Sequence, residues 1–404
     1  MNTQPSLTCP LDVTGNGPEF EFLLTCCRPQ PSAAHVVRQR ALAAAGLDTG
    51  KLLALGIRHK ISPLLYRNVK AHPPGSFAEE LLPALELQQQ RNTQRALRAL
   101  HASHELGRAT QGLQLLGLKG MDVAIRAYGD LAVRHVGDID IVVAPLHFER
   151  VLAVLKAQGW AIAEHDILAL ENRRLLSYGH HHGLLLRQNF PPLELHWRAS
   201  YNPYEFPLDW PTLRTAALAQ TSLAGLHHED LLIYLCLHGV THGWARLKWL
   251  FDLPNLIETH TFDWPRVWQR AHQLDAGLAL QQGLLLAQQY CGLHLSAEIR
   301  QGFRFKLSPS QWHLIQLFQQ GPELWMEKPP ARIMILTWMH RMRNARQWKA
   351  LLWHLMAMLY PSVNDYRLLK LPARLQWLYF PLRPLTWTFR RLQGLMLRMQ
   401  SAQK

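Results

Sequence analysis

The chain lacks any stretch of the roughly 18 uninterrupted apolar residues that span a bilayer. Residues 1–20 also lack the basic stretch followed by an apolar core that marks a secretory signal. Cysteine is scarce: the five residues are an odd number and show no C-x-x-C spacing, which argues against a disulfide framework and for reduced thiols in a core. We therefore expect a cytoplasmic protein, with peripheral contact to the inner membrane face as an open option.

Several common active-site motifs are missing as well. The sequence contains no Gly-x-x-x-x-Gly-Lys-Ser/Thr, no Gly-x-Gly-x-x-Gly and no Gly-x-Ser-x-Gly. These absences exclude the usual phosphate-loop, dinucleotide-binding and serine-hydrolase classes.

Acidic residues are scarce near the C-terminus. Residues 321–404 hold 14 Lys and Arg against 3 Asp and Glu, so +11 of the net charge of +14 lies there. Amphipathic basic helices with tryptophan fit an anionic membrane surface, and they equally fit helices that pack on the protein while their arginines reach water. Nucleic acid is a weaker alternative, because no helix-turn-helix, zinc-finger or single-strand-binding signature accompanies the charge. The tryptophans are Trp338, Trp348, Trp353, Trp377 and Trp387.

The remaining composition, 48% hydrophobic and 18% charged, is that of a folded globular protein. Short β-prone runs alternate with helical stretches between Leu113 and about Leu208, and the sequence on both sides of this segment has helical periodicity. We expect an α+β fold in which a small mixed sheet of about four or five strands is embedded in a largely helical protein, with no strand after Leu208. The expected regions are helical 1–112, an α/β core 113–207, a helical domain 208–320 that packs on the core, and a basic, Trp-rich helical region 321–404.

Two aspartates, Asp138 and Asp140, flank one apolar residue at the start of a β-branched run. Side chains alternate along a strand, so both carboxylates face one side and could share a cation. Hard oxygen ligands of this kind suit Mg²⁺. Taken alone, the pair is equally typical of a solvated strand end.

Two further segments favour a site. Lys119-Gly120 lies between a predicted strand, 115–118, and a predicted helix, 121–128, so free N–H groups and a positive charge could meet phosphate there. In the run 193–197, Glu194 and His196 share one face, and Glu194 could supply a third carboxylate or a general base. The alternative is an ordinary strand with a polar outer face.

Together these residues resemble the uncharacterised bacterial nucleotidyltransferase family, which belongs to the DNA-polymerase-β-like superfamily. The resemblance runs from about Glu19 to past Asp252. The superfamily usually has Gly-Ser where this chain has Lys119-Gly120. The matching segments are Lys119-Gly120, Tyr128, the run 134–143 (RHVGDIDIVV), the run 194–198 (ELHWR) and the helical run 238–253.

The resemblance implies a metal site of Asp138, Asp140 and Glu194, filled by Mg²⁺ or Mn²⁺. Lys119 and Gly120 would meet the phosphates, and Arg134 would contact the triphosphate or act as a structural partner of the aspartates. The implied reaction transfers a nucleoside monophosphate from a nucleoside triphosphate such as ATP to a small molecule, a glycan or a protein. Two alternatives stay open: a nucleotide-binding module without turnover, and a membrane-surface accessory protein of a polysaccharide or envelope pathway.

Histidines form two further candidate clusters. His238 and His242 lie four apart on a predicted helix, a spacing that zinc can use, but Gly239 stands where a metalloprotease has glutamate. We expect these two to pack on the α/β core, with Arg246 or Lys248 facing the nucleotide. For the run 180–182, alternation sends neighbours to opposite faces, which predicts a hydrogen-bonded edge near the cleft and no three-ligand site.

Overall fold

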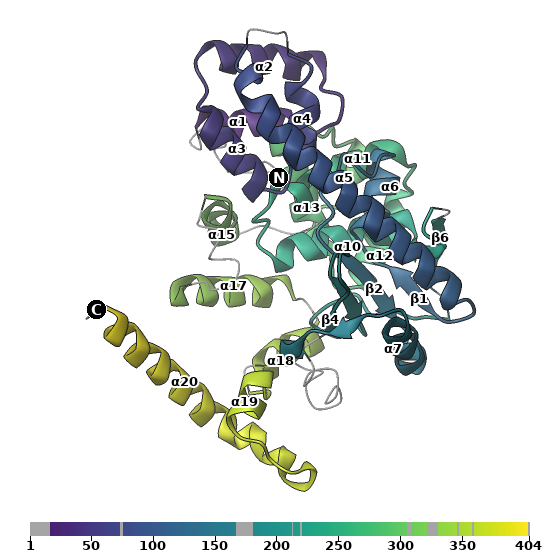
Figure 1. Cartoon of the computed structure of the whole chain (residues 1–404), viewed down its shortest axis with the longest axis vertical. Coiled ribbons are helices and arrows are strands. Elements are labelled where there is room, and N and C mark those ends of the chain that lie inside the picture. The colour runs from purple at the N-terminus through teal and green to yellow at the C-terminus, as the bar shows by residue number, and fades with distance from the viewer. Residues whose placement is uncertain are drawn as a thin grey trace, which may run out of the picture.

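The computed structural model describes residues 17–72, 76–166, 181–211, 213–218, 220–304, 309–320, 330–345, 347–357 and 359–402. Within these residues no helix combines the length and the apolar character that crossing a membrane requires. The expected α+β architecture is confirmed, because helices surround one mixed sheet (Figure 1).

The N-terminal part is helical. Side-chain caps start two of its helices: Ser32 accepts a hydrogen bond from the His35 N–H, and Asp48 accepts one from the Lys51 N–H. The long helix α5 packs against α4 and continues down along the sheet (Figure 1). The helices are α1 (Pro18–Thr25), α2 (Ala33–Ala44), α3 (Thr49–Arg58), α4 (Ser62–Val69) and α5 (Ala78–Ala109).

The sheet has seven strands in the order β3-β4-β5-β2-β1-β7-β6. Its central strand β2 pairs antiparallel with β1 and parallel with β5, and β1 pairs parallel with β7. The strands are β1 (Leu115–Gly117), β2 (Ile139–Val143), β3 (Ala161–Ile162), β4 (His182–Leu186), β5 (Leu193–His196), β6 (Thr215–Leu218) and β7 (Leu223–Leu226).

The two faces of the sheet are packed differently. Ile139, Ile141 and Val143 of β2 join a core with α5 and with α7 (Phe148–Ala157), which follows the short 3₁₀ turn Pro145–His147. Val142 joins the other core, with α6 (Met121–Tyr128), α10 (His228–Thr241) and α11 (Leu247–Thr259). Because strand side chains alternate, Asp138 and Asp140 turn to the side of α10 and α11.

The expectation that no strand follows Leu208 is wrong. β6 and β7 form a hairpin that extends the sheet beyond β1, so the sheet is larger than the four or five strands expected. Their sequences, TAAL and LAGL, are rich in Ala and Gly, which have low strand propensity, and this explains why the pattern did not predict them.

Helices continue the chain to its C-terminus. α17 packs on α15, and α20 projects away from the rest of the molecule (Figure 1). The remaining elements are the 3₁₀ turn Glu164–Asp166, α12 (Trp264–Gln273), α13 (Gly277–Cys291), α14 (Ala297–Gln301), α15 (Pro309–Gln320), α17 (Ala331–Asn344), α18 (Trp348–Ala357), α19 (Val363–Leu368), the 3₁₀ segment Ala373–Leu378 and α20 (Tyr379–Ala402).

Candidate functional site

Asp140 and Glu194 lie side by side on the parallel strands β2 and β5. The two residues are register partners, and alternation turns both side chains to the same face of the sheet. His196, two residues further along β5, places Nε2 3.3 Å from Asp140 Oδ1 and 3.2 Å from Glu194 Oε2. Asp140, Glu194 and His196 therefore form one close group, and Asp138 lies outside it on the wall of the adjoining cavity.

Lys119 holds a positive charge between the two carboxylates. Its Nζ lies 2.6 Å from Asp140 Oδ1 and 3.9 Å from Glu194 Oε2. Burial disfavours the charged ammonium, but Asp140, Asp138 and Glu194 outweigh burial and raise the pKa of Lys119 well above its ordinary value. This lysine is consequently a fixed cation of the site.

Glu194 is also kept ionised. Burial opposes its charge, but the contact with His196 and the charge of Lys119 prevail and hold the pKa of Glu194 well below its ordinary value. An ionised carboxylate of low pKa is a good metal ligand and a weak base.

The turn before α6 brings backbone close to the aspartates. Gly120 has a φ of +64° at the N-cap of α6. A Cβ there would lie 3.2 Å from the Asp138 carbonyl oxygen and 3.6 Å from Asp140 Oδ2. Both the left-handed backbone and the close approach therefore require glycine.

Arg134 is engaged by groups other than the predicted aspartates. Its Nε and Nη2 each donate to Asp252 of α11 at 2.8 Å, and its Nη1 donates to the Gly120 carbonyl at 3.1 Å. Tyr128 also donates to Asp252, at 3.0 Å. This buried network ties α11 to the glycine turn.

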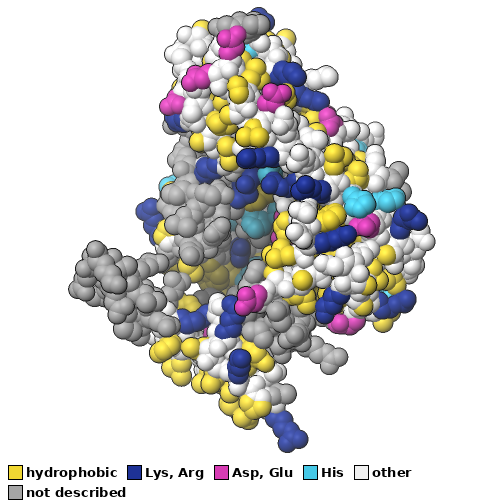
Figure 2. Space-filling model, viewed as in Figure 1, with side chains coloured by type: hydrophobic (Ala, Val, Ile, Leu, Met, Phe, Trp, Pro, Cys, Tyr) yellow, Lys and Arg dark blue, Asp and Glu magenta, His cyan; other side chains and the backbone are white. Residues whose placement is uncertain are grey.

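A cavity of about 380 Å³ adjoins these groups. Some residues of its wall were predicted from the sequence. Others, from α10, α17 and the loop after β5, were not predicted. Figure 2 shows a recess on this face of the molecule, with dark-blue and cyan side chains on its walls. Among the lining residues are Lys119, Gly120, Arg134, Asp138, Glu194, Arg246 and Lys248, which were predicted, and Tyr201, Tyr234 and Arg341, which were not.

Lys248 lies on the cavity wall, and its pKa is shifted in the opposite direction to that of Lys119. Burial and the neighbouring charges of Arg134 and Lys119 lower its pKa from 10.5 to about 7. No acidic side chain within the described ranges lies at ion-pair distance from its ammonium. An anion that entered the cavity would supply that missing partner.

His238 and His242 form an aromatic cluster with Trp249 of α11 on the wall of the cavity. Their ring centroids lie 4.5 Å apart, and the Trp249 ring lies 5.3 Å from His238 and 5.1 Å from His242. Neither histidine belongs to a group with metal-ligand geometry among the described residues.

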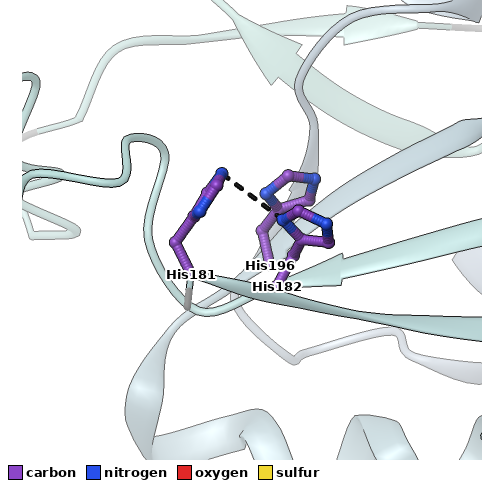
Figure 3. Close-up of side chains that lie close together, drawn as sticks. All are labelled: His181, His182 and His196. Carbon is purple, nitrogen blue, oxygen red and sulfur yellow. Dashed lines mark hydrogen bonds between the residues drawn. The ribbon is translucent and has the colours of Figure 1, made fainter. Parts of the chain in front are cut away.

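The expectation that alternation sends neighbouring histidines of this run to opposite faces is wrong for His181 and His182. His181, His182 and His196 each present one ring nitrogen within 4.8 Å of the others (Figure 3). Alternation does not separate His181 from His182, because β4 begins only at His182 and His181 lies in a bend. His180 lies outside the described residues.

The carboxylate group fits a divalent metal ion. Asp140 Oδ2 is buried and has no hydrogen-bond partner in the described part of the chain. A buried carboxylate oxygen without a partner is unfavourable unless a cation or water completes it. The donors here are the hard oxygens that Mg²⁺ and Mn²⁺ prefer.

Comparison with known proteins gives one match. A family model described as "Uncharacterised nucleotidyltransferase" matches residues 45–292. That span includes β1 to β7, the glycine turn and the helices α10 and α11. No curated protein and no solved structure matches the chain.

Proposed function

The chain belongs to the uncharacterised nucleotidyltransferase family, and from this premise we propose that it transfers a nucleoside monophosphate from a nucleoside triphosphate to an acceptor, using a divalent metal ion. The observation that carries the proposal is a cavity lined by Asp138, Glu194 and several cations, which adjoins the Asp140–Glu194 pair on adjacent strands. The volume, about 380 Å³, lies within the roughly 300–1,000 Å³ of small-molecule sites.

Asp138, Asp140 and Glu194 would hold the metal. The unpartnered Asp140 Oδ2 and the register pairing of Asp140 with Glu194 support this assignment, and Asp138 extends it to the cavity wall. Mg²⁺ or Mn²⁺, when bound, would neutralise phosphate charge and align the reacting groups.

The triphosphate would occupy the cationic side of the cavity. Lys119 and the N-terminus of α6 after Gly120 offer a charge and backbone N–H groups at one end. Arg246 and Lys248 line the same cavity from the start of α11. The contacts of Arg134 with Asp252 and Gly120 favour a positioning role: it holds the turn in place.

The proposed reaction is an in-line displacement at the α-phosphorus. An oxygen of the acceptor forms the new bond to phosphorus, with an acceptor hydroxyl releasing its proton to water, and the bond to the bridging oxygen breaks, so pyrophosphate leaves with the electron pair. The low pKa of Glu194 favours its role as a ligand over that of general base. The cavity itself does not distinguish a small molecule, a glycan or a protein as acceptor.

A transfer assay tests the proposal. The full chain is incubated with each α-labelled nucleoside triphosphate, Mg²⁺ or Mn²⁺ and cell lysate, and labelled products are separated. Asp140→Asn and Glu194→Gln are expected to abolish transfer, whereas Glu86→Gln, an exposed glutamate on α5, is expected to retain it. Equal transfer by wild type and by Asp140→Asn would refute the catalytic assignment.

Nucleotide binding without transfer identifies the first alternative. Fluorescence titration of the same variants with Mg²⁺ and a nucleoside triphosphate measures binding independently of any acceptor. A wild-type protein that binds nucleotide through these residues and labels no lysate component would be a nucleotide-binding module that has lost turnover.

The surface of the C-terminal helices supports a second candidate property, contact with an anionic membrane. Large apolar side chains are exposed there, with Trp348 68%, Trp377 63% and Leu385 66% accessible. In the described part of residues 330–402 the one acidic residue, Asp365, is buried and paired with Arg383 and Arg390. The exposed charges are therefore cationic: Arg332, Arg343, Lys349, Arg367, Lys370 and Arg374.

This pairing of apolar side chains with cations matches an anionic lipid surface. The lower part of Figure 2 shows yellow and dark-blue side chains together. We propose that the face carrying Trp377, Leu385 and Trp387 binds vesicles that contain anionic lipid. Self-association through the same face is the competing outcome.

Co-sedimentation with vesicles distinguishes membrane binding from self-association. Wild type is expected to sediment with phosphatidylserine vesicles and not with neutral phosphatidylcholine vesicles, and Trp377→Ser/Trp387→Ser is expected to weaken sedimentation. Leu87→Ser/Leu97→Ser, which changes exposed leucines of α5, is the matched control. Equal sedimentation of both double variants, or loss of a dimer by Trp377→Ser/Trp387→Ser without any lipid dependence, would overturn the membrane assignment.

A further inference from the structure

Three histidines gather at the edge of the cavity, on the side of the sheet that carries Glu194. His182 and His196 are cross-strand partners on the antiparallel strands β4 and β5, so their side chains leave the sheet on the same face. His181 precedes β4 and turns its ring toward them (Figure 3). The ring centroids of His181 lie 4.6 Å from His182 and 5.4 Å from His196, and those of His182 and His196 are 4.8 Å apart.

One nitrogen of this cluster lacks a partner. The Nε2 atom of His196 lies at ion-pair distance from Asp140 and Glu194, whereas its Nδ1 is buried and has no hydrogen-bond partner among the described residues. His196 is 2% exposed. A buried ring nitrogen without a partner costs free energy unless a proton acceptor, a water or a metal ion completes it.

The rings of His181 and His182 lie close enough to His196 and to each other for one ion to meet a nitrogen of each. Neutral imidazoles keep a lone pair for a metal ion. The two rings approach each other with His182 Nδ1 3.4 Å from His181 Nε2.

We propose that His181, His182 and His196 form a second metal site, which takes a transition-metal dication of the Zn²⁺ class beside the carboxylate site. Imidazole nitrogens select Zn²⁺, Co²⁺ or Ni²⁺ over Mg²⁺, and three protein ligands at a cavity leave a coordination position open for water or a substrate oxygen. His196 would connect the two sites, with Nε2 facing the carboxylates and Nδ1 facing the second metal.

A comparison within the chain shows why this cluster is singled out. His227, His228 and Glu229 also lie within metal-ligand distance of one another. However, Arg214 contacts both Glu229 and His227, and His228 contacts the Thr261 carbonyl oxygen. Glu229 and the Nε2 atoms of both histidines are therefore engaged, and the remaining buried Nδ1 of His227 lies 3.5 Å from Glu229 Oε2, so this second cluster serves as the control.

Metal binding by the full chain tests the proposal without nucleotide or turnover. Chelator-treated protein is titrated with Co²⁺, whose visible d–d bands report nitrogen coordination, and Zn²⁺ is then added as competitor. Wild type is expected to bind one Co²⁺ that Zn²⁺ displaces, and His181→Ala/His182→Ala is expected to bind at least ~10–100-fold more weakly, since the loss of outer-shell partners alone has that effect.

Two further variants separate this site from its neighbours. His227→Ala/His228→Ala should bind Co²⁺ as wild type does. Asp138→Asn, which alters the proposed Mg²⁺ site, should also keep the Co²⁺ bands, so failure of the proposed transferase function and failure of the histidine site are distinguishable. Zn²⁺ should raise the melting temperature of wild type and not that of His181→Gln/His182→Gln, whose side chains conserve more volume if the alanine variant does not fold.

Three results would overturn the proposal. They are a wild type without d–d bands, wild-type Co²⁺ affinity in both the alanine and the glutamine variants, and loss of binding in His227→Ala/His228→Ala.

Discussion

Lys248→Met is expected to stabilise the protein and to weaken nucleotide binding. The pKa of Lys248 falls from 10.5 to about 7 on folding. Below the folded pKa both states carry the proton, so the folded state bears the full electrostatic cost, roughly 5 kcal/mol at about 1.4 kcal/mol per pH unit. Between pH 7 and 10.5 the unfolded state binds more protons, so the stability of wild type rises with pH through that window.

Methionine removes the charge and keeps an apolar chain of similar length. At pH 6 the melting temperature of Lys248→Met should exceed that of wild type by about 6 °C, if the unfolding entropy is about 2.1 cal/mol/K per residue. At pH 9 nearly half of this difference should remain, because the unfolded lysine is then still largely protonated and the folded one is not. Scanning fluorimetry at both pH values measures it, with Lys156→Met on the exposed face of α7 as control. A pH-independent difference, or a less stable Lys248→Met at pH 6, would refute the argument.

The same lysine makes nucleotide binding dependent on protons. A bound triphosphate favours the protonated form of Lys248, so nucleotide binding to wild type at about pH 8.5 should be accompanied by the uptake of close to one proton. Lys248→Met lacks this titratable group, so that uptake should be absent. Calorimetry in two buffers of different ionisation enthalpy measures the uptake. The lost charge-assisted contact should weaken affinity by about 1.5–3 kcal/mol, or roughly 10–150-fold.

Three shorter predictions follow from the turn, the buried ion pair and the metal. Gly120→Ala should lower the free energy of unfolding by more than the ~1–2 kcal/mol of a left-handed backbone and should abolish transfer. Gly129→Ala, at φ +66° with open space around it, should lower the free energy of unfolding by that backbone contribution alone, as thermal unfolding measures it, and should retain transfer. Asp252→Asn leaves Arg134 buried without its carboxylate and should lower stability by ~3–5 kcal/mol, compared with ~1 kcal/mol or less for Glu21→Gln at a surface pair. EDTA should abolish label transfer and added Mg²⁺ or Mn²⁺ should restore it; transfer that persists in EDTA would contradict metal dependence.

Local patterns in the sequence predict which side chains of the candidate site share a face of the sheet. The alternation in Ile139–Val143 fixes the face of Asp140, and that in Leu193–His196 fixes the face of Glu194 and His196. The pairing of β2 with β5 then makes Asp140 and Glu194 register partners. Strand periodicity is a property of neighbouring residues, so it can be read without knowing the fold.

Some residues reach the cavity only through tertiary contacts, and the sequence did not predict them. Arg341 reaches the cavity from α17, and nothing in its local sequence distinguishes it from the other arginines of that region. Asn92 of α5 bonds the Ala132 and Arg134 carbonyls and the Val136 N–H, which shapes the loop before Asp138. The contacts of Asn92 join residues 40–44 positions apart and that of Arg341 with Thr241 joins residues 100 positions apart, so they leave no periodic signal.

The C-terminal region is therefore more than an appended basic segment. Arg341 of α17 lines the cavity and donates to the Thr241 carbonyl at 3.3 Å, and the Trp353 ring of α18 lies 4.4 Å from Tyr201, another cavity residue. A deletion of residues 321–404 would remove a cavity wall together with the exposed Trp and Leu side chains, and could not assign a lost activity to either. Point variants at Trp377, in the segment Ala373–Leu378, and at Trp387, on the projecting helix α20, keep that wall and change only the surface, so they are the sound test of what the surface binds (Figure 1).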